Sequence, residues 1–552
     1  MFDKTKYNKT AKNNFSKLFF TLNSNRVKNK LLLASVFVTG AAVLIVEIVA
    51  IRIFAPHYGN TIYTTSSVIG TVLAALSLGY YMGGLLSDKY PNYSFFYGII
   101  SVSGLSIIFI RFLENTILPI FSPLFPITVG LLLSSVFIFF TPAFLLGTLS
   151  PFAIKLYHVK YVQDVALPKA GQFNMMNKKD IGQDKVGSQS GEVFFWSTLG
   201  SIAGSLLSGF VFIPHFGVNF IVMATGIIIS IWGLCGFLIS QPKNSKILIM
   251  IILFFLSEIF LLWFSTPPKP NEVIYEKDGI YEKIKITDGQ WKGRPARFLS
   301  QDKSQSAAMY LDSDELAYDY TKYYELYKLI NPNATSAFLI GGGAYSIPKA
   351  LLNDSPKMQV DVTEIEPELF GLARKYFNLQ ANPRLANYTE DGRRFLNKNQ
   401  KKYDIIVSDV YYSLFSIPIH FTTKEFFSLA KSRLSDKGVF IGNFAGDLDK
   451  KHPSLILSEI KTFKNIFPNS YFFAVDSITS KNPQNIIFLG INGQKKIDFK
   501  GDLILKSNNP IIKTVPQKNI DLADFEFSQY QEITDDFSPI EYLVGNMINK
   551  WY

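Results

Sequence analysis

Cysteine is almost absent from this chain of 552 residues, because Cys235 is the only one. A single cysteine excludes a disulfide within the chain and any zinc site built from several cysteines. Charged residues are also scarce, at 18% of the chain, which is less than a typical soluble domain carries. Apolar residues make up 48%, so the low hydrophobicity and high net charge that are typical of disordered chains are excluded for most of the length.

Acidic residues are nearly absent from residues 1–30, where Asp3 is the only one. Eight basic residues lie in the same segment: Lys4, Lys6, Lys9, Lys12, Lys17, Arg26, Lys28 and Lys30. The net charge of +11 alone would suggest nucleic acid, but this basic segment directly precedes an apolar run. Such a placement is typical of contact with anionic lipid. We therefore read residues 1–30 as a basic tail and expect a lipid bilayer, and no nucleic acid, as a partner.

Long apolar runs dominate the first half of the chain. A membrane-spanning helix needs about 20 apolar residues. Such spans are predicted near 31–54, 67–87, 95–112, 127–149, 193–213, 219–240 and 247–265. The first run is not a cleavable signal peptide, because it has no short apolar core followed by a small-residue cleavage site. Residues 31–266 are therefore expected to form a multi-pass α-helical domain of about seven spans in the cell membrane.

Three features of the membrane half allow more than one function. Glu47 and Arg52 lie in the first span and Glu258 in the last, and an ionisable group at membrane depth marks either a functional site or an ion pair. Small residues recur at helical spacing in the fifth span, between Gly200 and Gly209, for which we favour close helix packing over a substrate path. The run from Gly83 to Lys89 resembles the loop after the second helix of major facilitator transporters.

The composition changes near residue 267. Three prolines at 267, 268 and 270 indicate a linker, and the later apolar runs shorten to strand length between Gly, Asn and Asp turns. Residues 267–325 are expected to form this linker and a small β region, with short strands over 273–312. Further strands are predicted near 336–340, 358–363, 386–389, 403–409, 438–443 and 485–490. Because these strands alternate with helical patterns, residues 326–495 are predicted to form an α/β domain with a doubly wound parallel sheet. Residues 496–552 are read as a C-terminal extension.

Glycine or acidic residues follow four successive strands of this predicted sheet. The turn Gly341–Gly343 follows the first and precedes a helical stretch, where glycine lets the backbone approach a ligand. Glu364 follows the second strand, at the spacing where a nucleoside ribose would present its hydroxyls. Asp391 with Gly392 and then Asp409 follow the third and fourth strands. Each acid alone is typical of a turn or cap, but the four endings share one sheet edge and together predict nucleoside binding.

With these motifs, the α/β part resembles the spermidine synthase (polyamine aminopropyltransferase) family. The whole chain resembles the membrane-fused bacterial branch of that family. The resemblance covers about residues 273–495 and stretches of the membrane half such as 77–84 and 197–204. It implies a methyltransferase-like sheet and a transferase of polyamine biosynthesis. The reaction it implies is aminopropyl transfer from decarboxylated S-adenosylmethionine to a small-molecule amine.

The resemblance also implies roles for individual residues. Asp409 matches the catalytic aspartate after the fourth strand, and Tyr318 resembles the tyrosine of the amine pocket. Tyr411 is a second candidate for the amine, through a hydrogen bond or a cation–π contact. Segments 418–427 and 534–541 resemble the membrane-fused branch. The nucleoside would be held by Gly341, Gly342 and Gly343, by Glu364 at the ribose, by Asp391 and Gly392 beside the adenine, and by Gln305.

Two departures from the family pattern bear on the substrate. The soluble enzymes follow the three glycines with an aspartate that binds the aminopropyl amine, and this chain has Ala344 there. They also carry a second aspartate after the catalytic one, where this chain has Val410-Tyr411-Tyr412-Ser413. Both departures remove negative charge from a site expected to bind cationic amines. They leave nucleoside binding in place but bring spermidine as the product into question.

Three functions therefore stay open. An aminopropyltransferase-like enzyme is the expected one. A methyltransferase that uses S-adenosylmethionine is the second, because an aspartate at position 344 would have repelled the carboxylate of that nucleoside. A transporter or sensor with a non-catalytic nucleoside-binding domain is the third, supported by Glu47, Glu258 and the transporter-like loop. No metal is expected, since His420 is the only histidine near the motifs and has no partner at ligand spacing.

The orientation of the α/β part is in tension with its chemistry. The basic tail, Lys89 and the Lys-bearing loop at 155–185 fall on one side of the predicted spans, which places the N-terminus in the cytoplasm. Seven spans would then put the α/β part outside the cell, away from S-adenosyl nucleotides. On chemical grounds we expect it in the cytoplasm, which requires one span fewer.

Overall fold

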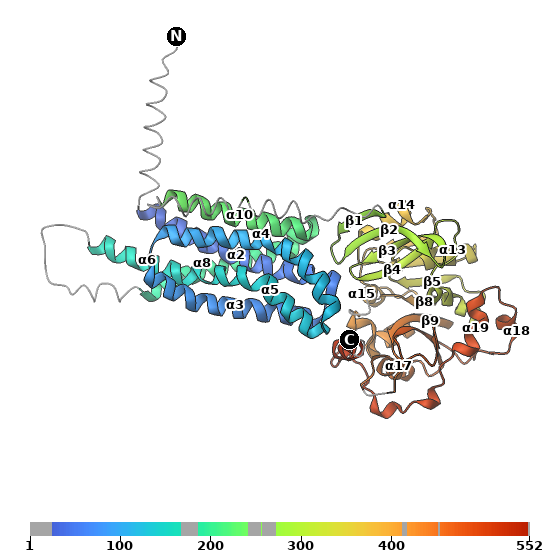
Figure 1. Cartoon of the computed structure of the whole chain (residues 1–552). Helices are drawn as coiled ribbons and strands as arrows, with labels where there is room; N and C mark the ends of the chain where they lie inside the picture. The colour runs from blue at the N-terminus through green and yellow to red at the C-terminus, as the bar shows by residue number, and fades with distance from the viewer. Residues whose placement is uncertain are drawn as a thin grey trace, which may run out of the picture. The chain divides into compact units, whose positions relative to one another are not determined.

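A computed structural model of the chain describes residues 25–166, 186–240, 256, 272–410, 417–450 and 453–549. It divides into two compact units (Figure 1). One unit comprises residues 1–54 and 63–268, and the other comprises residues 55–62 and 269–552. We describe each unit by itself.

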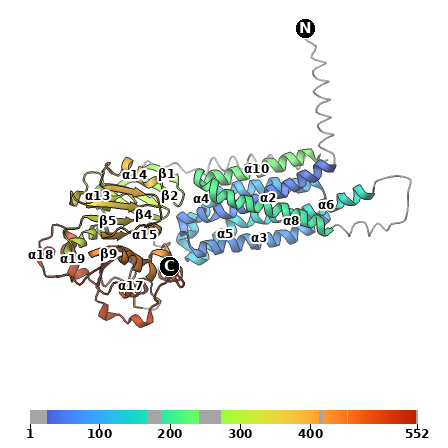
Figure 2. The same ribbon diagram turned by 180° about the vertical axis from the view of Figure 1, so that it is seen from behind.

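The first unit is a bundle of long helices (Figures 1 and 2). Its elements are α2 (Asn25–Tyr58), α3 (Ile62–Lys89), α4 (Tyr93–Leu124), α5 (Ile127–Gly147), α6 (Leu149–Ala166), α8 (Val186–Leu207), a π-helical turn (Ser208–Phe212), α9 (Ile213–His215) and α10 (Val218–Ile239). Among the described residues, six helical stretches are long and apolar enough to cross a membrane. They correspond to the first six predicted spans, whereas the predicted span at 247–265, with Glu258, lies outside the described residues.

Glycine brings the helix backbones of this unit into contact. A Cβ atom on Gly200 would lie 2.0 Å from the carbonyl oxygen of Phe37, and one on Gly204 would lie 2.4 Å from that of Ala41. The Ser201 hydroxyl donates a hydrogen bond of 3.1 Å to the Gly40 carbonyl. Helices α2 and α8 can approach this closely only because the side chains between them are small. The stripe of small residues in the fifth span therefore serves packing.

The second unit opens with a four-stranded antiparallel sheet of order β1-β2-β3-β4. Its strands are β1 (Val273–Asp278), β2 (Lys283–Trp291), β3 (Arg294–Gln301) and β4 (Ser304–Tyr310). The β2–β3 hairpin turns through Lys292 and Gly293, both with positive φ, which is the geometry that two-residue hairpins prefer. A short helical segment, η2 (Asp319–Leu326) and α12 (Tyr327–Ile330), leads from this sheet to the next.

A mostly parallel seven-stranded sheet follows, in the order β10-β11-β9-β8-β5-β6-β7. Its strands are β5 (Ser336–Ile340), β6 (Gln359–Thr363), β7 (Leu385–Tyr388), β8 (Tyr403–Ser408), β9 (Leu434–Gly446), β10 (Ser470–Ala474) and β11 (Gln484–Ile491). Strands β5 to β9 pair in parallel, whereas β11 pairs antiparallel to both β9 and β10. The sequence prediction missed β10, a run of five residues that closely follows a helix and is too short for a clear period-two pattern.

Helices cover both faces of this sheet (Figure 1). Alternate residues of β5 enter separate cores: Ala337 and Leu339 belong to one, Phe338 and Ile340 to the other. Helices α13 (Ser346–Asp354) and α14 (Glu368–Tyr376) pack on the first face. Helices α15 (Gly392–Lys398), α16 (Lys424–Ser432) and α17 (Leu455–Ile466) pack on the second. This is a doubly wound α/β arrangement, in which ligands bind at the carboxyl ends of the strands.

The chain after the sheet packs back onto it. Its helices are α18 (Asp502–Leu505), α19 (Pro510–Lys518) and α20 (Ile540–Asn549). Ile512 and Val515 of α19 are buried in the core of the first face. Ile533 and Ile540 pack with Leu455 of α17 in a smaller cluster. Residues 496–549 therefore bury their own apolar side chains against the α/β domain.

Candidate active site

A cavity of about 490 Å³ opens at the carboxyl ends of the parallel strands. Eight further residues predicted for the site line it together with the catalytic candidate Asp409: Gln305, Tyr318, Gly341, Gly342, Gly343, Glu364, Asp391 and Gly392. They come from β4, from the segment before η2 and from the ends of β5, β6, β7 and β8. Tyr411 lies outside the described residues. Residues far apart in the chain thus meet in one concave site, as parallel strands require.

The glycine turn after β5 brings the backbone close to the catalytic candidate. Gly341 has a φ of +90°, and a Cβ atom there would lie 2.2 Å from the carbonyl oxygen of Asp409. The amide of Asp409 in turn donates a 3.0 Å hydrogen bond to the carbonyl of Ile340. Only glycine satisfies both this dihedral angle and this approach. Gly341 therefore fixes how near the ends of β5 and β8 lie to each other.

Glu364 holds the same turn from the end of β6. One oxygen of its carboxylate accepts hydrogen bonds from the Gly342 and Gly343 amides, at 2.9 and 3.0 Å, and the other accepts one of 3.0 Å from the Glu366 amide. The side chain is 7% exposed. Burial raises the pKa of Glu364, and these backbone donors oppose that rise. Glu364 therefore holds the glycine turn in place and also lines the cavity.

Asp391 is both a helix cap and part of the cavity wall. Its Oδ1 accepts a 2.8 Å hydrogen bond from the Arg394 amide at the start of α15, and its Oδ2 lies 2.9 Å from Nε2 of His420. Burial acts to raise the pKa of Asp391, but the bond from His420 and the backbone donors of α15 outweigh it and lower the pKa. A Cβ atom on the adjacent Gly392 would lie 2.3 Å from Cγ2 of Ile340, so glycine lets the helix meet the sheet there.

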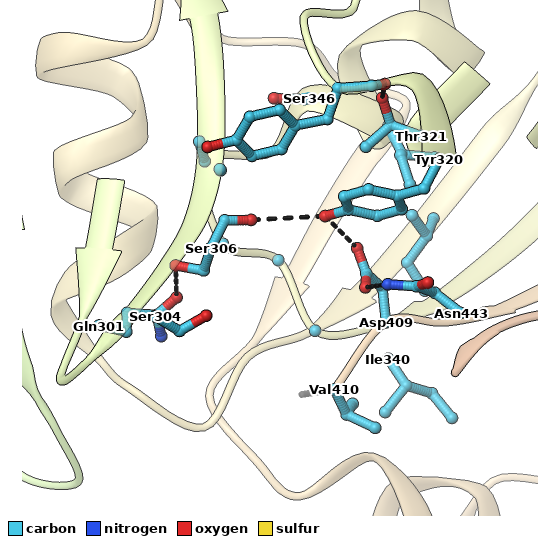
Figure 3. A pocket seen from close by; sticks show the side chains of 18 of the residues that line it. Gln301, Ser304, Ser306, Tyr320, Thr321, Ile340, Ser346, Asp409, Val410 and Asn443 are labelled. Carbon is cyan, nitrogen blue, oxygen red and sulfur yellow. Dashed lines mark hydrogen bonds between the residues drawn. The ribbon is translucent and has the colours of Figure 1, made fainter. Parts of the chain in front are cut away.

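Asp409 lies at the centre of a hydrogen-bond network (Figure 3). Its Oδ1 accepts a 2.9 Å bond from Nδ2 of Asn443, and its Oδ2 accepts a 3.3 Å bond from the Tyr320 hydroxyl. Asn485 supports this arrangement by donating from Nδ2 to Oδ1 of Asn443 at 2.8 Å. Burial raises the pKa of Asp409, and the two donors oppose the rise. The result is a buried carboxyl that is held in place and can accept a proton more readily than a free aspartate.

Sequence reasoning missed Tyr320, Asn443 and Asn485. Tyr320 lies in a stretch that holds several other tyrosines, between 318 and 327, so its sequence context does not distinguish it from them. Asn443 and Asn485 did carry a signal, because each is a polar residue within an apolar strand pattern, in β9 and β11. A polar side chain in a buried strand needs a hydrogen-bond partner. The succession of bonds from Asn485 to Asn443 and from Asn443 to Asp409 became visible only when the sheet order placed β8, β9 and β11 side by side.

Aromatic rings form another wall of the cavity. The rings of Trp291 and Tyr318 meet edge to face with centroids 5.1 Å apart, and Tyr318 and Tyr320 lie 6.0 Å apart. The Tyr318 hydroxyl donates to Oε1 of Gln305 at 3.1 Å, which brings two predicted site residues into contact. Burial raises the pKa of both tyrosines, so their hydroxyls stay protonated and act as donors. Aromatic faces beside a carboxylate are suited to a cationic or partly cationic nitrogen.

The described part of the chain holds no group of three His, Cys, Asp or Glu residues that could bind a metal ion. The ionisable residues of the cavity are engaged with protein donors instead. Asp391, for example, is engaged with Nε2 of His420 and the Arg394 amide.

Comparisons with known proteins agree with this architecture. Residues 325–500 match the family profile of the spermine/spermidine synthase domain. A polyamine aminopropyltransferase of Vibrio vulnificus is 24% identical over 281 residues, which cover 50% of this chain and 92% of that protein. An N-terminal histidine N-methyltransferase of Emericella nidulans is 30% identical over 203 residues, which cover only 35% of that protein. A crystal structure of a probable spermidine synthase from Corynebacterium glutamicum is 19% identical over 45% of this chain and 95% of that one, with a TM-score of 0.38.

The predicted resemblance is thereby confirmed for the α/β unit, which contains a spermine/spermidine synthase domain. The predicted fold is confirmed as well: long apolar helices come first, and a mostly parallel seven-stranded sheet follows.

Proposed function

We propose that this chain is a membrane-anchored transferase that moves an aminopropyl group from decarboxylated S-adenosylmethionine to an amine. The observation that carries the proposal is the position of Asp409. It is a buried carboxyl, held by Tyr320 and Asn443, and its backbone directly contacts the glycine turn. A nucleoside held at that turn presents its sulfonium arm toward this carboxyl. The similarity to polyamine aminopropyltransferases supports the same chemistry.

The residues of the cavity fit a nucleoside co-substrate. Gly343 has positive φ and no atom within 4 Å of its Cβ direction, so open space adjoins the turn. Glu364 accepts two hydrogen bonds from the turn and one from the Glu366 amide, and it lines the cavity where a ribose hydroxyl would bind. Asp391 is held by His420 and by the Arg394 amide, which would fix its position beside the adenine of the nucleoside. Gln305 reaches the same cavity from β4.

The reaction requires a nitrogen lone pair and a place for a proton. The amine nitrogen attacks the methylene carbon next to the sulfonium. A C–N bond forms, the C–S bond breaks, and its electron pair stays on sulfur as a neutral thioether. The new ammonium gives its extra proton to a base, for which Asp409 is positioned. Because a free alkylamine has a pKa near 10, a carboxylate that also attracts and orients the amine assists at both stages.

The amine would lie between Asp409 and the aromatic wall. Tyr318 and Trp291 offer ring faces to the methylene chain and to a cationic nitrogen. Ala344 lines the cavity without adding charge, so the acid that binds the aminopropyl amine in the soluble enzymes has no counterpart there. Tyr411 stays a candidate on sequence grounds alone. These differences affect the amine side of the site and leave the nucleoside side intact.

A methyltransferase that uses S-adenosylmethionine is the second candidate, and Ala344 is the observation that favours it. A neutral residue there leaves the cavity free of an acid that would repel the carboxylate of that nucleoside. The similarity to a histidine N-methyltransferase points the same way. The two candidates share the nucleoside site and differ in which sulfonium substituent is transferred.

Calorimetric titration of the detergent-solubilised full chain separates the candidates. Decarboxylated S-adenosylmethionine and S-adenosylmethionine are each added to the wild-type protein and to Ala344→Asp. We expect the wild type to bind the decarboxylated form more tightly, because the Asp409 carboxylate would repel the carboxylate of S-adenosylmethionine. Mass spectrometry of products formed with a panel of amines then identifies the transferred group. A clear preference for the carboxylated form, with methylated products, would overturn aminopropyl transfer.

Membrane anchoring is the second part of the proposal. Six described helices have the length and apolar composition of spans, and if each crosses the bilayer the chain returns at Ser240 to the side of its N-terminus. The basic tail places that side in the cytoplasm. Reporters fused after Ser240 and after Tyr552 test the position of the α/β domain, and we expect both to be active in the cytoplasm. A reporter after Tyr552 that is active only outside would refute both the orientation and the use of S-adenosyl nucleotides.

A further inference from the structure

Residues 532–537, here named the C-terminal strap, contact the outside of the cavity wall. The Lys424 amide donates a 2.9 Å hydrogen bond to the carbonyl of Ile533, and the Ile533 amide donates to Oγ1 of Thr462 at 2.9 Å. The Asp535 amide donates to Oε2 of Glu425 at 3.0 Å. Ile533 itself is completely buried. The strap is therefore fixed at several points along its backbone.

The Asp535 side chain forms a two-pronged ion pair with Arg393. The guanidinium donates to both carboxylate oxygens, at 2.8 and 2.5 Å, and the Thr423 hydroxyl donates to the same carboxylate at 2.8 Å. The ion pair lowers the pKa of Asp535, so the group is ionised at neutral pH. Parallel bonds of this kind set an orientation as well as a distance.

Arg393, the ion-pair partner of Asp535, lies next to a residue that lines the cavity. Arg393 follows Gly392, and its Nη1 also donates to the carbonyl of His420 at 3.1 Å. The His420 ring then meets Oδ2 of Asp391 at 2.9 Å. A continuous set of contacts thus runs from Asp535 through Arg393 and His420 to Asp391. None of these contacts reaches Asp409 or its hydrogen-bond partners.

We propose that the C-terminal strap positions the nucleoside side of the active site, with Asp535 and Arg393 as positioning residues that act through His420 on Asp391. This inference rests on the proposed function, because it assumes that a nucleoside binds beside Asp391. Arg393 holds the backbone of His420 at the correct distance for its ring to reach Asp391. The orientation of Asp391 consequently depends on a residue that lies more than 140 positions later in the chain.

The experiment compares Asp535→Asn with Asp536→Asn in the full chain in detergent. Both changes remove one negative charge from neighbouring exposed positions, but Asp536 has no role in the contacts described above. The affinity for decarboxylated S-adenosylmethionine is measured by calorimetry, and KM and kcat are measured with an amine that the wild type accepts. Thermal unfolding of each protein is followed in parallel.

We expect Asp535→Asn to weaken nucleoside affinity about three- to tenfold, as coupling between neighbouring groups does. Its kcat at saturating nucleoside and its KM for the amine should stay at the wild-type values, and Asp536→Asn should match the wild type throughout. His420→Ala should weaken affinity by a similar factor, and the double variant should lose little more than either single variant, because both act on Asp391. Asp535→Glu should restore part of the affinity.

Three outcomes decide the matter. Wild-type affinity in Asp535→Asn overturns the strap proposal alone. Equal losses of affinity and kcat together with a lower unfolding temperature also overturn it, because they indicate a general structural role. A wild-type chain that binds neither decarboxylated S-adenosylmethionine nor S-adenosylmethionine overturns the proposed function, and the strap proposal with it.

Discussion

Replacing Asp409 with asparagine removes one ionisable group and keeps the shape of the site. The amide oxygen can accept the 2.9 Å bond from Asn443, which leaves the new NH₂ group facing Tyr320. The Tyr320 hydroxyl can accept from that group and turn its own hydrogen toward the carbonyl of Ser306, which lies 3.4 Å away. The network therefore has an alternative set of donors and acceptors, and we expect the fold and the nucleoside site to persist.

The expected loss lies in the chemical step. A positioned general base contributes about 10²–10⁴-fold to the rate. At 1.36 kcal/mol per factor of ten, this corresponds to about 3–5 kcal/mol of activation free energy. An amide cannot take up the proton of the attacking nitrogen, so kcat should fall by this factor. If Asp409 only attracts a cation, the change should instead raise KM for the amine and leave kcat nearly intact.

The same substitution, which should lower kcat, should leave the stability of the fold unchanged or raise it. Burial raises the pKa of Asp409 above its value of 3.8, so the folded protein holds this proton more tightly than the unfolded chain does. The ionised side chain therefore costs stability at pH values above the raised pKa, and the cost disappears as the pH falls toward 3.8. We expect Asp409→Asn to unfold at the wild-type temperature or higher at neutral pH, with a smaller difference in acid.

Asp404→Asn is the matched control, because Asp404 lies at the opposite end of the same strand. It accepts bonds from Thr335, Ser336 and Ser435, and although burial opposes them these bonds lower its pKa. Its ionised form therefore stabilises the fold above the unfolded-state pKa and ceases to do so as the pH falls. Asp404→Asn should lower the unfolding temperature at neutral pH and spare kcat. Equal turnover by Asp409→Asn and the wild type at saturating amine would remove Asp409 from the mechanism.

Three further substitutions test the rest of the site. Glu364→Gln should weaken nucleoside affinity about tenfold, which is the scale of a hydrogen bond to a charged group. It should also lower the unfolding temperature, because the new NH₂ group would face backbone donors. Unchanged affinity by calorimetry would mean that Glu364 only holds the glycine turn. Gly341→Ala should destabilise the fold by at least about 1–3 kcal/mol from backbone strain, measured by chemical unfolding against Gly371→Ala, where the added Cβ meets nothing within 4 Å. Tyr318→Phe keeps the ring and loses the bond to Gln305, so KM for the amine should rise about two- to tenfold at constant kcat; a fall in kcat alone would contradict a binding role.

Most of the predicted site residues line the cavity because a parallel sheet gathers them. Gly341, Glu364 and Asp409 each follow a strand, and the carboxyl ends of such strands meet at one edge. Residues 337–340 of β5 form a continuous apolar run, which is typical of a strand buried on both faces, and the structure places its alternate residues in two cores. These features depend on local sequence and on a general rule of sheet architecture, so no knowledge of distant contacts is needed.

The partners of those residues could not be predicted in the same way. Tyr320 lies 89 positions before Asp409, and Asp535 lies 142 positions after Arg393. Neither spacing follows from helix or strand periodicity. Asp391 shows the other difficulty: the sequence allowed a helix cap or a ligand contact, and the structure gives it a cap and a place on the cavity wall at once. Local rules identify where a side chain sits, whereas the groups that it meets depend on the whole topology.

The carboxyl groups of Glu364 and Asp409 differ in the donors that hold them, and this difference suggests different roles for them. Glu364 accepts three bonds from backbone amides, which cannot rotate away, so its ionised form is fixed whatever else happens in the site. Asp409 accepts from an asparagine side chain and a tyrosine hydroxyl, and the hydroxyl can turn toward Ser306 and leave a lone pair for a proton. Burial acts on both groups to raise the pKa. Where two carboxyl groups share a site, the one whose surroundings can adjust is the one able to change its protonation during a reaction. We therefore propose Asp409 for proton transfer, with Glu364 holding the glycine turn in place while it occurs.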